Sequence, residues 1–313
     1  MSTFVAALVG PTAVGKSAVA VEVALALGAE IVSVDSMQVY RGMDIGTDKP
    51  GPELTQRVRH HLLDVFDPSE EVTVEDFQRL ARAAIADIVA RRRVPLLVGG
   101  SGLYFRAVVD DLRFPPRSPK LRAELEGLVE EQGARALWQR LAALDPEAAA
   151  RIEPGNARRT VRALEVIELT GRPFSGNRTW DDYTSIYDLR AAGLYRSRGE
   201  LYERITRRAE EMVGQGLIAE AERLAAAGPA RALAQALGYR QVLELQGAPP
   251  EEVAAAVARA TKRFARRQLS WFRADPRIVW FDAAREDLVA ALVSFFSAAD
   301  AQEPAPDQVP SGR

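Results

Sequence analysis

The segment from Gly10 to Ser17 constrains the fold of this chain more than any other feature of its sequence. Its residues, GPTAVGKS, fit the pattern G-x-x-x-x-G-K-S/T, between an apolar run at 4–9 and a helical pattern at 16–27. A strand, a glycine loop and a helix in this order bind phosphate through loop N–H groups and the positive end of the helix dipole. The sequence therefore predicts a phosphate loop made of Gly10, Pro11, Thr12, Ala13, Val14, Gly15, Lys16 and Ser17.

Lys16 and Ser17 give this loop its expected chemistry. The lysine adds a positive charge beside the phosphate, and the serine offers its hydroxyl to a bound magnesium ion. The loop does not identify the phosphate compound, for which ATP or GTP, as in a kinase or a switch protein, is the usual choice. An ordinary glycine turn is the alternative, but the strand before the loop and the helix after it argue against that interpretation.

Strand and helix patterns alternate over residues 1–111. Further buried strands are expected at 30–34, 62–64 and 95–99, and a capping signal at Thr73 begins a helix that continues to about residue 92. This alternation predicts an α/β fold with a P-loop NTPase-like core, in which a parallel sheet is flanked by helices.

The pattern changes after residue 111. Residues 112–186 are predominantly helical, with breaks at glycines and prolines, and they predict an all-helical insertion domain. The core is expected to resume at 187–299 with two more strands, at 187–195 and 278–281, and with several helices. The proline-rich, polar tail at 300–313 is expected to be disordered.

Composition sets limits on location and partners. The chain has 313 residues, no cysteine and a formal net charge of -2. The lack of cysteine excludes disulfides and thiolate metal sites, and it fits a reducing compartment. No stretch approaches the ~20 apolar residues of a membrane span, and we find no signal peptide, so we expect a cytoplasmic protein with no membrane contact. Because the net charge is close to zero, a nucleic-acid site must be a local basic patch.

Two further segments follow strands of the predicted sheet and are expected at the same edge as the phosphate loop, because chemistry gathers at the carboxyl ends of parallel strands. Asp35 follows the strand at 30–34 and is a candidate magnesium ligand, a candidate general base or a cap for its own loop. Ser101 follows the strand at 95–99 and either contacts substrate or caps the next helix. The adjacent His60 and His61 point to opposite sides of a strand and make a poor metal pair.

Several segments resemble the successive motifs of the tRNA dimethylallyltransferases. They are GPTAVGKS (10–17), VDSMQVYRGMDIGTDKP (34–50), HHLLD (60–64), LLVGGSGLYF (96–105), ERITRRAEEMVGQGLIAEAERL (203–224), ALGYRQ (236–241) and TKRFARRQLSWFR (261–273). The similarity extends over nearly the whole chain, and its most specific part is the block at 34–50, which phosphate-loop kinases do not carry. Ser101 departs from the pattern, because the family usually has threonine there; the hydroxyl is kept, and we expect slightly looser packing.

The resemblance implies a reaction in which the phosphate loop binds dimethylallyl diphosphate instead of ATP, with Mg²⁺ as cofactor. The acceptor would be N6 of the adenosine at position 37, directly 3′ of the anticodon in tRNA. Asp35 would be the general base, and Ser101 and Arg208 would also belong to the catalytic group, with the arginine reaching the diphosphate. Without the resemblance, Arg208 is equally well explained as a surface helix residue paired with Glu211 or with charges on the side of Glu200.

The resemblance also implies contacts with the tRNA anticodon stem-loop. Arginines near one face of a predicted helix at 259–267 suit phosphate groups, and Arg158, Arg159 and Arg162 open a helix whose dipole they oppose, which favours an external anion. Gln38 either binds a base edge or faces water. The predicted tRNA-binding residues are Asp35, Ser36, Met37, Gln38, Ser101, Arg122, Arg158, Arg159, Arg162, Gly238, Tyr239, Arg240, Lys262, Arg263, Arg266 and Arg267.

Three other functions compete with tRNA prenylation by a monomeric enzyme. A nucleoside or nucleotide kinase would use the same core and consume ATP without RNA. A prenyltransferase acting on free AMP would not need the arginine clusters or the helical insertion. A non-catalytic RNA-binding module would have no reason to keep Lys16, Ser17 and Asp35 together.

Overall fold

The computed structural model describes residues 3–176, 182–228 and 231–298, which form two compact units. The first unit comprises Met1–Asp110 and Ser185–Arg313, and the second comprises Asp111–Thr184. The insertion expected from the sequence was 112–186, within two residues of the second unit at each end. The expected disordered tail at 300–313 lies outside the described residues.

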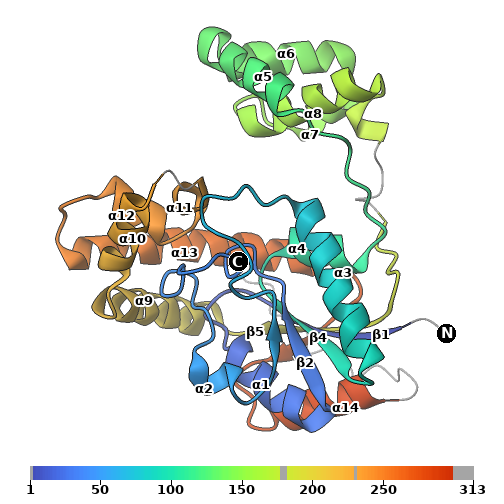
Figure 1. Cartoon of the computed structure of the whole chain (residues 1–313), viewed down its shortest axis with the longest axis vertical. Helices are drawn as coiled ribbons and strands as arrows, with labels where there is room; N and C mark the ends of the chain where they lie inside the picture. Colours follow the sequence, from blue (N-terminus) through green and yellow to red (C-terminus); the bar gives the residue numbers. More distant parts are fainter. Residues whose placement is uncertain (1–2, 177–181, 229–230, 299–313) are drawn as a thin grey trace. The chain divides into compact units, whose positions relative to one another are not determined.

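A six-stranded parallel sheet forms the centre of the first unit (Figure 1). Its strand order is β3-β2-β4-β1-β5-β6. Its strands are β1 (Phe4–Val9), β2 (Ala29–Ser33), β3 (His60–His61), β4 (Val94–Gly99), β5 (Asp188–Tyr195) and β6 (Ile278–Asp282). The predicted α/β fold with a parallel sheet is therefore confirmed. The chain leaves β1 toward β2 but leaves β4 toward β5, so the two central strands are followed by connections in opposite directions, the arrangement that opens a ligand crevice.

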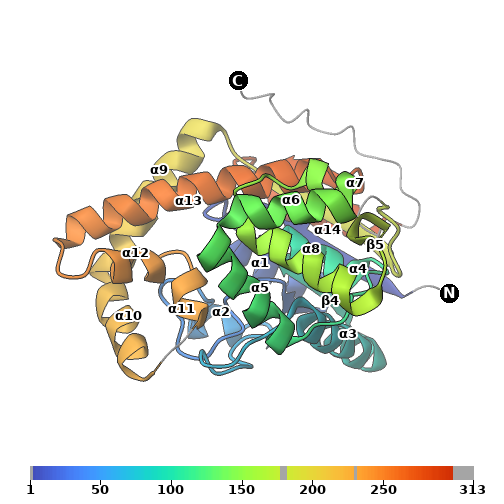
Figure 2. The ribbon, with the colours of Figure 1, turned by 90° about the horizontal axis from the view of Figure 1, so that it is seen from above.

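Helices cover both faces of this sheet. Because crossovers between parallel strands are right-handed, the opposite directions of the connections place α1 on one face and α3 with α4 on the other. The helix α14 packs beside α1, and α9 lies beside α13 in both views (Figures 1 and 2). The helices of this unit are α1 (Lys16–Leu27), α2 (Pro52–Thr55), α3 (Val74–Ala90), α4 (Gly102–Val109), α9 (Arg198–Gly214), α10 (Leu217–Ala226), α11 (Arg231–Gln235), α12 (Tyr239–Glu244), α13 (Pro250–Arg273) and α14 (Leu288–Ser297).

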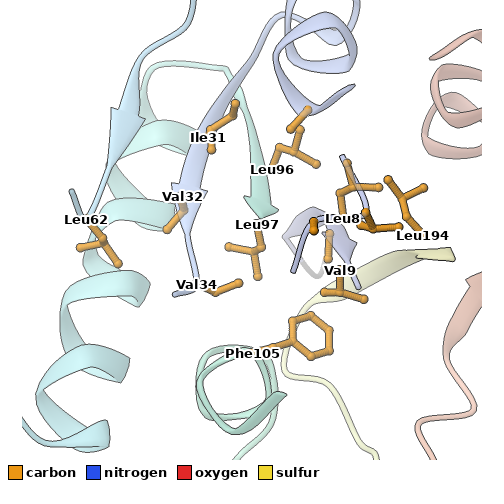
Figure 3. Close-up of a cluster of buried hydrophobic side chains, with 14 of the residues drawn as sticks. Leu8, Val9, Ile31, Val32, Val34, Leu62, Leu96, Leu97, Phe105 and Leu194 are labelled. Carbon is orange, nitrogen blue, oxygen red and sulfur yellow. The ribbon is translucent and has the colours of Figure 1, made fainter. Parts of the chain in front are cut away.

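The core of the first unit consists of apolar side chains from the central strands, joined by side chains of the covering helices. Leu8, Val32 and Leu97 are fully buried, and Phe105 of α4 packs into the same cluster (Figure 3). Strands buried on both faces are expected to be continuous apolar runs, as these are. The predicted capping box also forms, because the Thr73 hydroxyl accepts from Asp76 N–H at 3.0 Å and the Asp76 carboxylate accepts in return from Thr73 N–H.

The strand expected at 62–64 was wrong in position. The third strand is β3, and it pairs with Ile31 and Val32 of β2. Leu62 and Asp64 have φ angles of 65° and 55°, in the left-handed region that strands do not use. The apolar side chain of Leu62 still packs into the core, which is why its segment resembles a strand in sequence.

The second unit is a bundle of short helices: α5 (Pro119–Gln132), α6 (Ala134–Leu144), α7 (Pro146–Arg151), α8 (Ala157–Thr170) and the 3-10 helix η1 (Phe174–Gly176). Its own core contains Leu125, Leu137, Leu141 and Leu164. Prolines at the first turns of α5 and α7 and Gly171 after α8 set the helix boundaries, as the sequence pattern indicates. In the part of the chain that the structure describes, no helix is both long enough and apolar enough to cross a membrane.

Candidate active site

A cavity of about 710 Å³ lies in the first unit, at the carboxyl ends of β1, β2 and β4. Its walls are the loops that follow these strands and the facing sides of α9 and α13. Segments distant in the sequence therefore meet at one place, as the strand-end argument predicts. The predicted site residues in its wall are Thr12, Ala13, Gly15, Lys16, Ser17, Asp35, Ser36, Met37, Gln38, Ser101, Arg208, Arg240, Arg263 and Arg267.

The phosphate loop adopts the turn that its glycines allow. Gly10 has φ 144°, and a Cβ at this position would lie 2.7 Å from the carbonyl oxygen of Leu194 in β5. Gly15, with φ 109°, caps the start of α1, so the positive end of that helix dipole lies at the loop. This arrangement suits an anion, because loop N–H groups and the helix end favour negative charge at the same point.

Lys16 is a partly buried side chain inside this loop. Its Nζ donates to the carbonyl oxygens of Gly10 and Pro11, at 3.0 and 2.7 Å. Burial lowers the pKa of Lys16 to about 7, assisted by the nearby charge of Arg208 and opposed by Asp35. A bound anion would restore the charged form, so Lys16 is poised to respond to a phosphate group.

Arg208 approaches the loop from α9. Its Nη1 donates to the Thr12 hydroxyl at 3.3 Å, and its Nη2 forms an ion pair with Asp48. Burial lowers the pKa of Arg208 to about 10, and Nε is buried without a hydrogen-bond partner. The expected surface pair with Glu211 does not form, since Glu211 pairs with Arg207.

Asp35 lies in the cavity wall, directly after β2. Its Oδ1 accepts from the Met37 N–H at 2.8 Å, so the carboxylate caps its own turn while it also lines the cavity. Burial raises the pKa of Asp35, whereas the Met37 N–H and the charges of Lys16 and Arg208 oppose that increase. A carboxylate with a raised pKa beside two cations is suited to accept a proton.

Ser101 does not cap the helix that it precedes. It is the N-cap residue of α4 but makes no side-chain capping bond there. Its hydroxyl instead accepts from the Ser36 N–H at 3.4 Å and lies 3.5 Å from the Ser36 hydroxyl. The capping alternative was therefore wrong, and Ser101 joins the β4 turn to the loop that contains Asp35.

Gln38 lines the cavity and forms hydrogen bonds within the protein. Its Oε1 accepts from the Ser33 hydroxyl at 2.9 Å, and its Nε2 donates to the backbone oxygens of Thr47 and Asp48, both at 3.2 Å. These bonds engage the amide nitrogen twice and one of the two acceptor positions of the amide oxygen. Gln38 thus holds the 47–48 turn beside the cavity, and its contact with a base edge stays a prediction.

The prediction that Tyr239 contacts RNA is wrong, because its side chain is buried. It is fully buried, and its hydroxyl donates to Glu220 of α10 at 2.6 Å. The ring packs against Gly46, where a Cβ would lie 2.4 Å from a ring carbon. The side chain offers no surface to a nucleic acid, and the neighbouring Gly238 N–H is taken by the side chain of Gln241 at 2.9 Å.

Gln268 of α13 is a site residue that sequence reasoning missed. Its Oε1 accepts from the Thr12 N–H at 2.9 Å and its Nε2 donates to the Gly100 carbonyl oxygen at 2.8 Å. A buried amide thus joins the phosphate loop to the β4 turn. A polar residue within an arginine-rich helix face gives no sign of this role in sequence, apart from its place beside Arg267 in a helix that approaches the loop.

The cations of α13 form an exposed basic face. Arg259, Arg263, Arg266 and Arg267 are exposed, and two of them line the cavity. Among the described residues, none of these four forms an ion pair with a carboxylate; Arg267 instead lies over the Phe264 ring and Lys262 over the Tyr202 ring. Free positive charge beside a cavity suits a polyanion.

The arginines of the helical unit differ from those of α13. Glu165 of α8 is fully buried and accepts from Arg122 and Arg162, both at 2.6 Å. The charge that opposed the dipole of α8 is thus balanced inside the unit at Arg162, which corrects the argument for an external anion there. Arg158 and Arg159 are exposed.

The donor set of the cavity fits magnesium in its usual protein environment. Mg²⁺ is commonly bound through one or two protein oxygens together with substrate phosphates and waters. Ser17 and Asp35 supply a hydroxyl and a carboxylate in the cavity wall. Within the described residues, no cluster of three or more histidine, aspartate or glutamate side chains forms a dedicated metal cage, and His60 and His61 bind Val58 and Glu30 instead.

Comparison with known proteins identifies the family of this chain. The IPP transferase family model matches residues 38–275. A tRNA dimethylallyltransferase of Thermobifida fusca is 53% identical over 298 residues, covering 92% of each chain, and one of Salinispora arenicola is 51% identical over 290 residues, covering 91% of this chain and 84% of its own.

Solved structures give the same result. The full-length tRNA isopentenylpyrophosphate transferase of Bacillus halodurans is 42% identical with a TM-score of 0.69, covering 94% of this chain and 95% of its own. A eukaryotic dimethylallyltransferase acting on tRNA is 25% identical with a TM-score of 0.79, covering 93% of this chain and 77% of its own. Because the family model covers more than half of the chain and relatives about 50% identical cover nearly all of it, the chain belongs to the tRNA dimethylallyltransferase family.

Proposed function

We propose that this chain transfers the dimethylallyl group of dimethylallyl diphosphate to N6 of the adenosine at tRNA position 37 and releases diphosphate. The observation that carries the proposal is the presence of Asp35, Lys16 and Arg208 in the wall of one cavity, with the carboxylate and both cations influencing one another's pKa. A proton acceptor and an anion cradle are the two groups that this reaction needs.

The acceptor side of the reaction depends on Asp35. The lone pair of the exocyclic N6 amine is delocalised into the purine, so the nitrogen is a weak nucleophile. As the new C–N bond forms, the Asp35 carboxylate takes the N6 proton. Ser101, tied to the Ser36 N–H, keeps the strip that follows Asp35 in place.

The donor side depends on the phosphate loop. The bond between the reactive carbon and the diphosphate oxygen breaks, and the leaving group keeps the electron pair. Lys16, Arg208 and the positive end of α1 stabilise the negative charge that develops there. Each strong contact of this kind is typically worth about 3 to 4 kcal/mol in the barrier.

Magnesium is the implied cofactor, with Ser17 as its expected protein ligand. When bound, the ion would neutralise diphosphate charge and so assist departure of the leaving group. Asp35 stands close to the same cations, but its proposed task is proton transfer.

The RNA side depends on the basic face of α13. A base in a single-stranded anticodon loop can leave its stack more readily than a base in a duplex, so the adenosine reaches the cavity at modest cost. Arg263 and Arg267 line the cavity and would hold loop phosphates next to the extruded base. The helical unit is proposed to bind the anticodon stem, with Arg158 and Arg159 as its exposed cations.

Incubation of the protein with labelled dimethylallyl diphosphate, magnesium and an anticodon stem-loop tests the proposal. Label should pass to the RNA, and digestion should locate it on the adenosine next to the anticodon. Labelled ATP is the control donor, and AMP is the control acceptor. Phosphoryl transfer from ATP without RNA would favour a kinase, and prenylation of AMP at a comparable rate would favour the free-nucleotide enzyme. A monomeric state and a cytoplasmic location stay predictions.

A further inference from the structure

Asp48 is an acidic side chain in the wall of an anion site. It lines the same cavity as the phosphate loop and pairs with Arg208. A carboxylate beside a candidate phosphate-binding arginine opposes the binding of phosphate unless it can give way. The proposed reaction leaves this pairing unexplained.

The backbone fixes the position of Asp48. Its φ angle is 52°, in the left-handed region, and its N–H donates to the carbonyl oxygen of Ile45 at 3.1 Å. Its own carbonyl oxygen accepts from the amide of Gln38 at 3.2 Å. Glu220 holds the preceding turn through the N–H groups of Ile45 and Gly46, at 3.0 and 3.3 Å. The carboxylate is therefore presented to Arg208 by an anchored turn.

The guanidinium of Arg208 can donate more hydrogen bonds to negative oxygens than Asp48 accepts. One guanidinium nitrogen contacts Asp48, another reaches the Thr12 hydroxyl of the phosphate loop, and Nε is buried with no partner. The Asp48 side chain is half exposed, so solvent weakens its hold on the arginine. A diphosphate carries several negative oxygens and can satisfy more of the guanidinium at once.

We propose that Asp48 is an internal counter-anion of Arg208, which the diphosphate of the donor displaces. The inference rests on the proposed function of the cavity. In the free protein, Asp48 holds the arginine at the edge of the cradle. The diphosphate must compete with it, both as donor on entry and as product before release, so Asp48 lowers the affinity for both. Asp48 is thus a positioning residue that acts through Arg208.

Titration of inorganic diphosphate with magnesium into the full-length protein, without RNA, tests the proposal. Asp48→Asn removes the charge, keeps the shape of the side chain and tolerates a left-handed φ angle. The variant should bind diphosphate about two- to fivefold more tightly than the parent, the range expected for an exposed ion pair. In the transfer assay, the KM for the donor should fall by a similar factor while kcat does not rise.

Two controls isolate the effect. Asp44→Asn makes the same charge change in the same loop at a residue that pairs with Lys49 and not with Arg208, so diphosphate affinity should stay near that of the parent. In an Arg208→Ala background, Asp48→Asn should change the affinity by less than about half the factor seen in the parent, as a double-mutant cycle requires for a direct pair. Asp48→Gly, which also accepts this φ angle, provides a second variant if the asparagine protein melts early.

The outcomes separate this inference from the proposed function. If the parent transfers the prenyl group and binds diphosphate, but Asp48→Asn and Asp48→Gly bind it equally or more weakly, the counter-anion role is wrong and the enzyme assignment stands. An equal gain in Asp44→Asn would mean that general charge, not the pair, is responsible, and this also overturns the inference. If the parent binds no diphosphate, both the proposed donor site and the counter-anion role of Asp48 are wrong.

Discussion

Two helices in this molecule carry clusters of arginine, and they differ in whether an arginine is paired with a buried carboxylate. On α13, Arg263, Arg266 and Arg267 are exposed, and among the described residues none of them meets a carboxylate. On α8, Arg162 shares the buried Glu165 with Arg122 of α5. The two clusters look alike in sequence, yet Arg162 of α8 is paired inside its unit, whereas Arg158 and Arg159 of the same helix are exposed like the arginines of α13. Positive charge that a fold leaves uncompensated beside a cavity is the better guide to a binding surface.

The cavity brings charges of opposite sign together, because Asp35 lies in the same wall as Lys16 and Arg208. Of the changes considered, Asp35→Asn should reduce activity the most. The asparagine keeps an oxygen for the Met37 N–H but cannot accept the N6 proton, so the transfer rate should fall about 10³-fold, within the range of general-base catalysis. Single-turnover assays measure the rate, and filter binding should give an RNA affinity within about twofold of the parent. A loss of tenfold or less would remove Asp35 from the role of base.

Removing the free charge of α13 should have the next largest effect. The triple variant Arg263→Gln, Arg266→Gln and Arg267→Gln should weaken stem-loop binding about 10- to 100-fold at physiological salt. The slope of log affinity against log salt should decrease by about 2 to 3, because each lost phosphate contact releases fewer ions. Arg122→Gln is the matched single control, and it should change the slope by clearly less than about one. Equal slope changes per charge would erase the distinction between the clusters.

Raising the pH should weaken diphosphate binding moderately, and this change tests the role of Lys16 in the cavity. Burial lowers the pKa of Lys16 to about 7, so the free protein loses this charge as pH rises through 7. A bound diphosphate favours the charged amine, so binding above pH 7 should take up about one proton and weaken as pH increases. Calorimetry at pH 8 in buffers of different ionisation enthalpy measures the uptake. Lys16→Met removes the proposed source, and unchanged uptake in that variant would contradict the assignment.

The smallest effect on activity should come from changing Glu165, which is paired with Arg122 and Arg162. Burial alone would raise the pKa of Glu165, but the Ser118 N–H and the two arginines outweigh it, so the pKa lies below its usual value. A lowered pKa stabilises the fold at neutral pH, and this contribution is lost as pH falls through the folded-state value. Glu165→Gln should therefore cost the helical unit about 2 kcal/mol at neutral pH. Thermal melting measures the loss, while diphosphate binding should stay as in the parent; weakened diphosphate binding would show that the pairing serves the donor site as well.

The sequence predicted those parts of the molecule whose causes are local. The phosphate loop, its flanking strand and helix, and the capping box at Thr73 each depend on a few adjacent residues, and they formed as expected. The strand expected at Leu62 failed for a local reason as well, because apolar residues also fill a left-handed turn that packs on the core.

The residues that sequence reasoning missed have partners far along the chain. Glu220 serves a turn 174 to 176 residues away, and Gln268 serves the Thr12 N–H 256 residues away. No spacing rule connects such positions, so a buried amide or carboxylate in an amphipathic helix resembles any solvent-facing polar residue. Tyr239 was wrong for the same reason, since its buried partner lies on another helix.

The two hydrogen bonds of Gln268 limit how α13 can evolve. Inserting or deleting one residue upstream of this position in the helix would rotate its side chain by about 100° relative to the preceding arginines. The amide could then no longer reach Thr12 and Gly100 while Arg263 and Arg267 still line the cavity. The proposed nucleic-acid surface and the proposed diphosphate loop are thus in register along a single helix. Length changes should be tolerated in the flanking turns and rejected between residues 263 and 268.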